Sequence, residues 1–296
     1  MNRQLLEKAS PTRIHALFGL FPRALSELLA AALPVLLERR QQAQERRPDR
    51  KRAVGGGRKR RLSPYQEVLM TLLYLRHNVS HEVVGGMFGV SADTSENTFH
   101  EVVGVLREVC PSSRWDAEKK WNKSQPSWKP EEVDRLLIDS FETPIRRPSE
   151  DARQRRTYSG KKKRHTLKSQ VVTDAKGEIL EIDAGHRGPE ADIWIYEGSG
   201  VETRYPDAEK TADKAYQSSD HPTLHTPHKK PKGGELTPEQ REENRRLAQV
   251  RIYVEHGIRR IKGWRILRED YRLAVGLFAT VAQAVVGLVQ LGRILE

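Results

Sequence analysis

Apolar residues in the first third of the chain recur every three or four positions, which is the spacing of an amphipathic helix. This period predicts a helix over residues 21–44, with Pro34 kinking it or ending one of its turns. The period continues through residues 62–109, where Ser63 is placed to cap a helix, Pro64 to take its first position and Gln66 to complete a capping box. We therefore expect the N-terminal part to be all α.

Two of these helices have the arrangement of a helix-turn-helix. A short helix over 81–87 is followed by a turn at Gly89 and a longer helix from about Ala92, and Gly85 is small enough to let the two approach closely. The second helix would then present polar side chains to DNA: Asp93, Thr94, Ser95, Asn97 and Thr98. An ordinary helical hairpin is the alternative, because this helix carries few basic residues.

The helical period is lost between residues 111 and 132, where prolines and tryptophans stand among polar residues. We interpret this stretch as a connector between domains. Its three tryptophans, Trp115, Trp121 and Trp128, are expected to be local packing anchors rather than a platform for stacked bases.

Strand patterns begin at residue 133. A short apolar run ends in Asp139, an alternating run covers 165–174, a turn at 175–177 leads to a return strand over 178–184, and a fourth strand covers 208–213. Helices are predicted over 192–198 and from Thr237, as N-cap, to about residue 263. This order of elements indicates a mixed α/β fold, with a mixed sheet packed against helices.

The chain closes with an apolar run over residues 273–291 that contains no charged residue. Its length is at the threshold for a membrane-spanning helix. Because the run includes Gln283 and Gln290, and no other span is visible in the sequence, we favour a helix that covers the sheet over membrane insertion.

The charge of the chain indicates a polyanionic partner. Its formal net charge is +12, from 52 basic and 40 acidic residues. The excess is concentrated in residues 46–61, a glycine-containing basic run that ends in Arg58, Lys59, Arg60 and Arg61. Such a run is typical of a flexible linker, and we favour contact with DNA phosphates over a solvated spacer.

A single cysteine excludes a disulfide framework and a cysteine-based zinc site. The first residues contain no apolar segment of a secretory signal, so we expect an intracellular protein. Three histidines, His221, His225 and His228, are spaced so that they could bind zinc. They lie in a predicted loop without an evident fourth ligand, so solvated or DNA-facing histidines are favoured.

Three acidic residues are candidates for a shared site. Asp139 and Asp213 end predicted strands, and Glu255 lies on the helix that follows. Carboxylates converging at a sheet edge suit Mg²⁺ or Mn²⁺, and two such ions would support phosphoryl transfer on nucleic acid. The alternative for Glu255 is a surface ion pair with Arg251 or Arg259, which lie four residues to either side.

Several passages, in the right order, resemble the DDE transposases of bacterial insertion sequences, specifically the group related to harbinger-type transposases. The resemblance covers roughly residues 20–290. The passages that carry it are LSPYQEVLMTLLYLRHNVSHEVVGGMFGVSADT, LLIDSFETPI, YSGKKKRHTLKSQVVTDAKGEI and EKTADKAYQ. The Arg–x3–Glu–x6–Lys signature of related transposases is present as Arg251, Glu255 and Lys262.

The resemblance implies a ribonuclease-H-like core in which Asp139, Asp213 and Glu255 hold two Mg²⁺ or Mn²⁺ ions. The implied reaction is cleavage at the ends of the element, followed by attack of the freed 3′-hydroxyl on target DNA. Arg251 and Lys262 would neutralise phosphate near the site. Flanking backbone would be bound by Lys161, Lys162, Lys163 and Arg164.

The sequence departs from the family pattern in several places. The block that often contains a His-Asp pair reads Gly188 to Asp192 and lacks the histidine. This leaves Asp192 as a possible assisting ligand, although we prefer Asp213 because it ends a strand. A tyrosine of the related signature is replaced by Ala248, which puts the handling of DNA ends in doubt. Alanines Ala212 and Ala215 replace glycines that flank the second aspartate, a mild change.

The sequence thus predicts an N-terminal helical segment (1–45), a basic linker (46–61), a helix-turn-helix domain (62–110), a connector (111–132) and a catalytic domain (133–296). A catalytically silent DNA-binding relative is the alternative function, and an RNA nuclease on the same fold is disfavoured by the helix-turn-helix. The expected partner is double-stranded DNA, bound by a homodimer in a bacterial cytoplasm, in association with the nucleoid and without a membrane.

Overall fold

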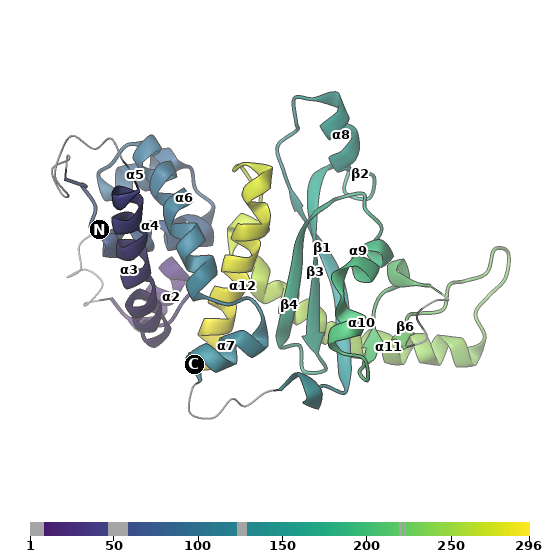
Figure 1. Ribbon diagram of the computed structural model, residues 1–296. Coiled ribbons are helices and arrows are strands. Elements are labelled where there is room, and N and C mark those ends of the chain that lie inside the picture. The colour runs from purple at the N-terminus through teal and green to yellow at the C-terminus, as the bar shows by residue number, and fades with distance from the viewer. Residues whose placement is uncertain (1–8, 47–58, 123–128, 219–220, 222) are drawn as a thin grey trace.

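The computed structural model describes residues 9–46, 59–122, 129–218, 221 and 223–296. A group of helices and a sheet stand at opposite ends of the molecule, and the last helix lies between them (Figure 1). Most of the basic run, with Arg58, falls outside the described residues, as does Trp128.

The helical end is built from locally specified helices. They are α2 (Pro11–Phe18), α3 (Pro22–Glu45), α4 (Pro64–His77), α5 (His81–Phe88), α6 (Ala92–Val109) and α7 (Arg114–Trp121). The predicted capping box is confirmed at α4, where Ser63 accepts from the Gln66 backbone N–H and the Gln66 side chain accepts from that of Ser63. Pro34 does not end α3, which continues past it to Glu45. Helix α7 occupies part of the stretch that we interpret as a connector, where the sequence pattern had not indicated a helix.

The helix-turn-helix pair is present as α5 and α6. Gly89 ends α5 with φ of 72°, a conformation that favours glycine, and a side chain at Gly85 would meet the backbone oxygen of Val90 at 2.7 Å. The prediction that Ser95 and Thr98 face solvent is wrong. Ser95 is 1% exposed and its hydroxyl lies 3.1 Å from His81 Nδ1, because it shares the buried face of α6 with Phe99.

The sheet contains β1 (Arg135–Pro144), β3 (Arg164–Asp174), β4 (Ile179–Arg187), β5 (Glu209–Thr211) and β6 (Leu224–His225), with the short β2 (Tyr158–Ser159) at the start of β3. Strand β4 pairs with β3, β3 with β1, β1 with β5 and β5 with β6. Only the β3 pairings are antiparallel, while β1, β5 and β6 run parallel. This strand order is that of a ribonuclease-H-like core, as predicted.

Helices cover both faces of the sheet. They are α8 (Asp151–Thr157), α9 (Asp192–Ser199), α10 (Val201–Arg204), α11 (Pro238–Lys262) and α12 (Phe278–Leu295), with short 3-10 turns η1 (Pro130–Glu132), η2 (Lys214–Tyr216), η3 (Arg265–Leu267) and η4 (Val275–Leu277). Side chains alternate along a strand. Leu137 and Phe141 of β1 therefore join the core on the α11 and α12 side, whereas Leu136 and Ile138 join a smaller core with Tyr196 of α9.

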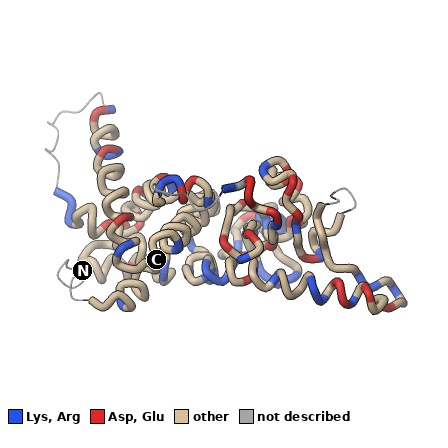
Figure 2. Tube along the Cα trace, turned by 90° about the horizontal axis from the view of Figure 1, so that it is seen from below, with Lys and Arg blue, Asp and Glu red and all other residues tan. Residues whose placement is uncertain are grey.

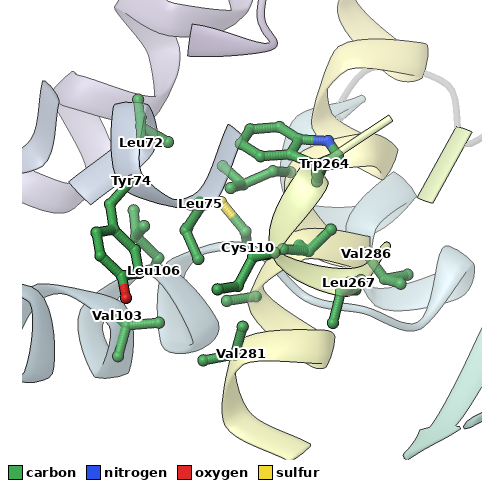
Figure 3. Close-up of a cluster of buried hydrophobic side chains, with 14 of the residues drawn as sticks. Leu72, Tyr74, Leu75, Val103, Leu106, Cys110, Trp264, Leu267, Val281 and Val286 are labelled. Carbon is green, nitrogen blue, oxygen red and sulfur yellow. The ribbon is translucent and has the colours of Figure 1, made fainter. Parts of the chain in front are cut away.

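Helix α12 joins the helical end to the sheet. Side chains of α4 and α6 meet those of α12 and of the segment around η3 in one cluster, which includes Leu106, Cys110, Leu267 and Val286 (Figure 3). Both glutamines in the apolar run have partners inside the protein: Gln283 accepts from Arg107 Nε at 2.6 Å, and Gln290 donates to the Ile179 carbonyl of β4 at 2.6 Å. The segment Val275–Leu295 is long and apolar enough to cross a membrane, but 56% of its most apolar window is buried inside the protein. The prediction that it covers the sheet is confirmed.

Candidate active site

Asp139 lies in the middle of β1, not at its end as predicted, because the strand continues to Pro144. It faces α11, where Arg251 Nη2 approaches its Oδ2 at 3.4 Å. Its Oδ1 accepts a hydrogen bond from the Ser140 backbone N–H at 2.8 Å. The carboxylate is therefore held inward, with 19% of the side chain exposed.

The surroundings of Asp139 disfavour its charged form. Burial raises the pKa of Asp139 to about 6. Arg251 and the Ser140 N–H lower this pKa, whereas the carboxylates of Asp213 and Asp192 raise it. Burial is thus the main reason that the charged carboxylate is disfavoured, and a cation bound beside Asp139 would offset that cost.

Asp213 follows the strand that pairs with β1. Strands β1 and β5 are parallel, and their last pair is Leu137 with Thr211, so Asp139 and Asp213 each lie two residues beyond that pair. The two carboxylates are close enough for the charge of Asp213 to raise the pKa of Asp139. Strand β5 ends at Thr211, two residues earlier than predicted, and Asp213 instead begins η2, where its Oδ1 accepts from the Ala215 N–H at 2.7 Å.

Glu255 is exposed on α11, one helical turn after Arg251. It shares a helical stripe with Arg251 and Lys262, four residues before it and seven after it. Arg251 contacts Asp139, and Lys262 Nζ lies 5.2 Å from the Phe141 ring centre, two residues further along β1 on the same face. Burial lowers the pKa of Lys262, and nearby Lys162 lowers it further.

The carboxylate of Glu255 is exposed, and Arg251 pairs with Asp139 instead of with it. Across the described parts of the chain, no group of three or more His, Cys, Asp or Glu side chains is gathered closely enough to hold a metal ion. The convergence of Asp139, Asp213 and Glu255 on a shared cation therefore stays a prediction. The expectation that the three histidines are solvated or face DNA, rather than bind zinc, also stays a prediction.

Asp192 is engaged on the opposite face of the sheet. It begins α9, accepts from the Ser140 hydroxyl at 2.6 Å and pairs with Lys168 Nζ at 3.0 Å. Lys168 is 6% exposed and also donates to the Glu190 carbonyl at 2.6 Å. Sequence reasoning missed Ser140 and Lys168. A lysine among the uncharged side chains in the middle of β3 is the signal that could have found the second.

The predicted DNA contacts lie in three separate places. Thr94 and Asn97 are exposed on α6. The turn between β2 and β3 carries exposed Lys161, Lys162, Lys163 and Arg164, of which Arg164 pairs with Asp270. Near the start of α4, Lys59 and Arg61 are exposed, whereas Arg60 is paired with Glu67 and Glu101 at 3.1 Å each. Lys and Arg are accordingly found at both the helical end and the sheet end (Figure 2).

Comparisons with known proteins match both parts of this architecture. Residues 138–290, which contain Asp139, Asp213 and Glu255, match the family model of the DDE superfamily endonucleases. Residues 60–112, which contain α4, α5 and α6, match the helix-turn-helix of DDE superfamily endonucleases.

Two curated relatives are similar over most of the chain. A probable transposase for insertion sequence element IS702 from Microchaete diplosiphon is 33% identical over 228 residues, 76% of this chain and 79% of that one. A putative transposase for insertion sequence element IS112 from Streptomyces albus G is 26% identical over 222 residues, 73% of this chain and 76% of that one. The Mos1 transposase in its paired-end complex with the left transposon end aligns over 88% of each chain, with 11% identity and a TM-score of 0.20. By the match over its sheet, α11 and α12, and by the 33% identity to an insertion-sequence relative, the chain belongs to the DDE superfamily endonucleases.

Proposed function

We propose that this protein is the transposase of a bacterial insertion sequence, which cuts DNA at the ends of its element and joins those ends to target DNA. One observation carries the assignment of the site. Asp139 of β1 and Asp213, which follows the adjacent parallel strand β5, are close enough to interact through charge, within a stretch that matches a DNA-cutting family. Glu255 lies on α11 one turn after Arg251, which contacts Asp139.

DDE endonucleases depend in general on divalent metal ions. The donor set here fits such an ion, because carboxylate oxygens are hard ligands and the two aspartates raise the local negative charge. Asp139, Asp213 and Glu255 would hold two Mg²⁺ or Mn²⁺ ions. When bound, these ions would activate the attacking oxygen and stabilise the leaving 3′-oxygen.

The protein's own cations would position the DNA around the carboxylates. Arg251 is 3.4 Å from Asp139 and would move to a DNA phosphate when the carboxylate takes up a cation. Lys262, half-buried on the same stripe of α11, is suited to the next phosphate along the strand. Asp192 is held by Lys168 and Ser140 on the other face, so it would orient β1 without binding the ion directly.

Recognition of the element ends belongs to the helical end. Exposed Thr94 and Asn97 on α6 would contact base edges, and the β2–β3 turn would bind flanking backbone. The basic run that ends in Arg58 would supply sequence-independent attraction. Joining two element ends requires two active sites, so we expect a homodimer on DNA, acting in the bacterial cytoplasm at the nucleoid.

Cleavage of a duplex that carries the element end, in the presence of Mg²⁺, tests this function. We expect the wild type to cut and each of Asp139→Ala, Asp213→Ala and Glu255→Ala to lose cutting while still binding the duplex. Asp207→Ala is the matched control, since Asp207 is an exposed aspartate on the turn before β5. A wild type that binds the ends without cutting them would instead identify a catalytically silent regulator.

A further inference from the structure

An arginine-lined groove lies at the far end of the sheet, away from the three carboxylates. Its volume is about 570 Å³. It is formed by the residues that follow β1, by helix α8 and by the segment from Tyr271 to Gly276 that leads into α12. This size lies within the range of about 300–1,000 Å³ typical of ligand-binding pockets.

The rim of the groove is strongly basic. Its lining contains six arginines and no acidic side chain: Arg146, Arg147, Arg153, Arg156, Arg187 and Arg272. Two of these have acidic neighbours outside the lining, Arg153 with Glu150 at 3.0 Å and Arg187 with Glu190 at 3.5 Å. Throughout the described ranges, neither Arg146 nor Arg156 has an acidic group within ion-pair distance. Like charges brought together without counter-charges favour the binding of an anion.

The floor of the groove is apolar. Ile145 and Leu167 are buried beneath it, and Val275 borders it with 51% of its side chain exposed. Arginine suits such a site, because its planar guanidinium binds phosphate oxygens in pairs and also packs against flat apolar groups. A ligand with phosphates at its edge and a less polar sugar or base beside them matches both the rim and the floor.

The groove is separate from the carboxylate site but shares its face of the sheet. Ile145 directly follows β1 and lies six residues after Asp139, and both point to the side of α11 and α12. A strand rises about 3.3 Å per residue, so about 20 Å separates them. This distance corresponds to about six nucleotides of B-form DNA, whose rise is about 3.4 Å per residue of one strand.

We propose that this groove binds the phosphodiester backbone of a DNA strand that extends from the cutting site, with Arg146 and Arg156 as its main phosphate ligands. The proposal rests on the proposed function for the identity of the ligand. Both nucleic acid and an acidic protein segment would complement the charge of the rim. The apolar floor favours nucleic acid, because sugars and bases would lie on it while the phosphates contact the rim.

The test measures how the affinity for duplex DNA depends on salt. Each phosphate contact contributes about 0.9 to the slope of log K against log salt. We expect the double variant Arg146→Gln/Arg156→Gln to flatten this slope by about 1.8. The ratio of wild-type to variant affinity should then be about 30-fold larger at about 0.15 M salt than at 1 M. Binding would be followed by fluorescence anisotropy with a labelled duplex of arbitrary sequence.

Two control variants separate groove binding from total charge. Arg155→Gln/Arg241→Gln removes the same charge from exposed arginines outside the groove, the first of them on the same helix α8, and should leave the slope close to that of the wild type. Arg146→Lys/Arg156→Lys keeps the charge and should largely restore the slope. An unchanged slope in the glutamine double variant, or an equal change in the control pair, would overturn the proposal.

Small anions distinguish the source of the bound phosphate. Inorganic phosphate and deoxyadenosine monophosphate should compete with duplex DNA only weakly, because each offers a single phosphate. Strong competition by the mononucleotide, with the slope for the duplex unchanged in the variant, would replace the DNA groove with a nucleotide site. Loss of cutting in Asp139→Ala is read independently, so failure of the groove and failure of the proposed function are distinguishable.

Discussion

Gly287 lies where α12 crosses the C-terminal end of α6, and replacing it with alanine tests the packing of the whole molecule. A Cβ atom added there would stand 2.0 Å from the backbone oxygen of Cys110 and 2.8 Å from the Cys110 Cβ. Real Cβ contacts are essentially never shorter than 3.0 Å, so one helix must move by about 1 Å. The backbone oxygen of Cys110 cannot rotate out of the way, as the end of a long side chain can.

The magnitude follows from two opposing effects. Overpacking of a well-packed interior destabilises by about 1–3 kcal/mol. Alanine in place of glycine inside a helix stabilises by about 1 kcal/mol. Because the clash is with backbone, we take the upper end of the first effect and expect a net loss of about 2 kcal/mol. In a chain of 296 residues, with an unfolding entropy of about 2.1 cal/mol/K per residue, that loss lowers the melting temperature by about 3 °C.

Gly292→Ala is the matched control on the same helix. Its added Cβ would meet Leu20 Cδ2 at 3.6 Å, an ordinary van der Waals contact, so only the helix-propensity gain of up to about 1 kcal/mol remains. Urea unfolding and thermal melting of the two variants would be compared with the wild type. If Gly287→Ala is as stable as Gly292→Ala, α12 does not approach the end of α6 and the shared core described above is wrong.

Three other predictions concern buried polar groups. Lys168→Met should destabilise the protein by about 3–5 kcal/mol in thermal melting, because it leaves the carboxylate of Asp192 without its cation. The double variant Lys168→Met/Asp192→Asn should recover part of this loss, and equal losses in the two variants would contradict a buried ion pair. Burial raises the pKa of Cys110 to about 12, so its thiol should resist a disulfide reagent at pH 8 until the protein is unfolded in guanidinium, and rapid labelling of the native protein would count against this burial. Burial alone would raise the pKa of Glu101, but hydrogen bonds and charge attraction from Arg40 bring this pKa below its ordinary value. The stabilisation by the Arg40–Glu101 pair is therefore present above about pH 4.5 and is lost as the pH falls further. Arg40→Gln should lower stability more at pH 7 than at pH 3, and an equal loss at both pH values would refute the coupling.

Local sequence signals were sufficient to predict most of the helices and strands. Ser63 and Gln66 specify the start of α4, and Thr237 with Gln240 does the same for α11, because capping involves residues only three apart. The sequence pattern also predicted the strand pair β3 and β4 and the order of the elements. The capped helix α7 was missed because its tryptophans and polar residues lack the apolar period, although Ser113 caps it by the same local rule.

Features that depend on distant pairing could not be predicted from local sequence. The pairing of β1 with β5 brings Asp139 near Asp213, although these residues are far apart in the chain. Ser95 was assigned to solvent because polarity alone does not reveal that the face of α6 it shares with Phe99 is buried against α5. The arginine groove combines residues from the segment after β1, from α8, from β3 and β4, and from the segment before α12, so no single motif marks it.

The single core that α12 creates has a mechanical consequence. Leu106 and Cys110 of α6 pack in the same cluster as Val286 of α12, and Gln290 of α12 is hydrogen-bonded to β4, so α6, the helix that we propose reads bases, is coupled to the sheet. The offset between α6 and Asp139 is then a fixed length of the folded protein. In such a molecule, the number of base pairs between a recognised sequence and the severed bond is dictated by rigid geometry, and lengthening that interval in the DNA by half a helical turn would present the wrong side of the duplex to the carboxylates.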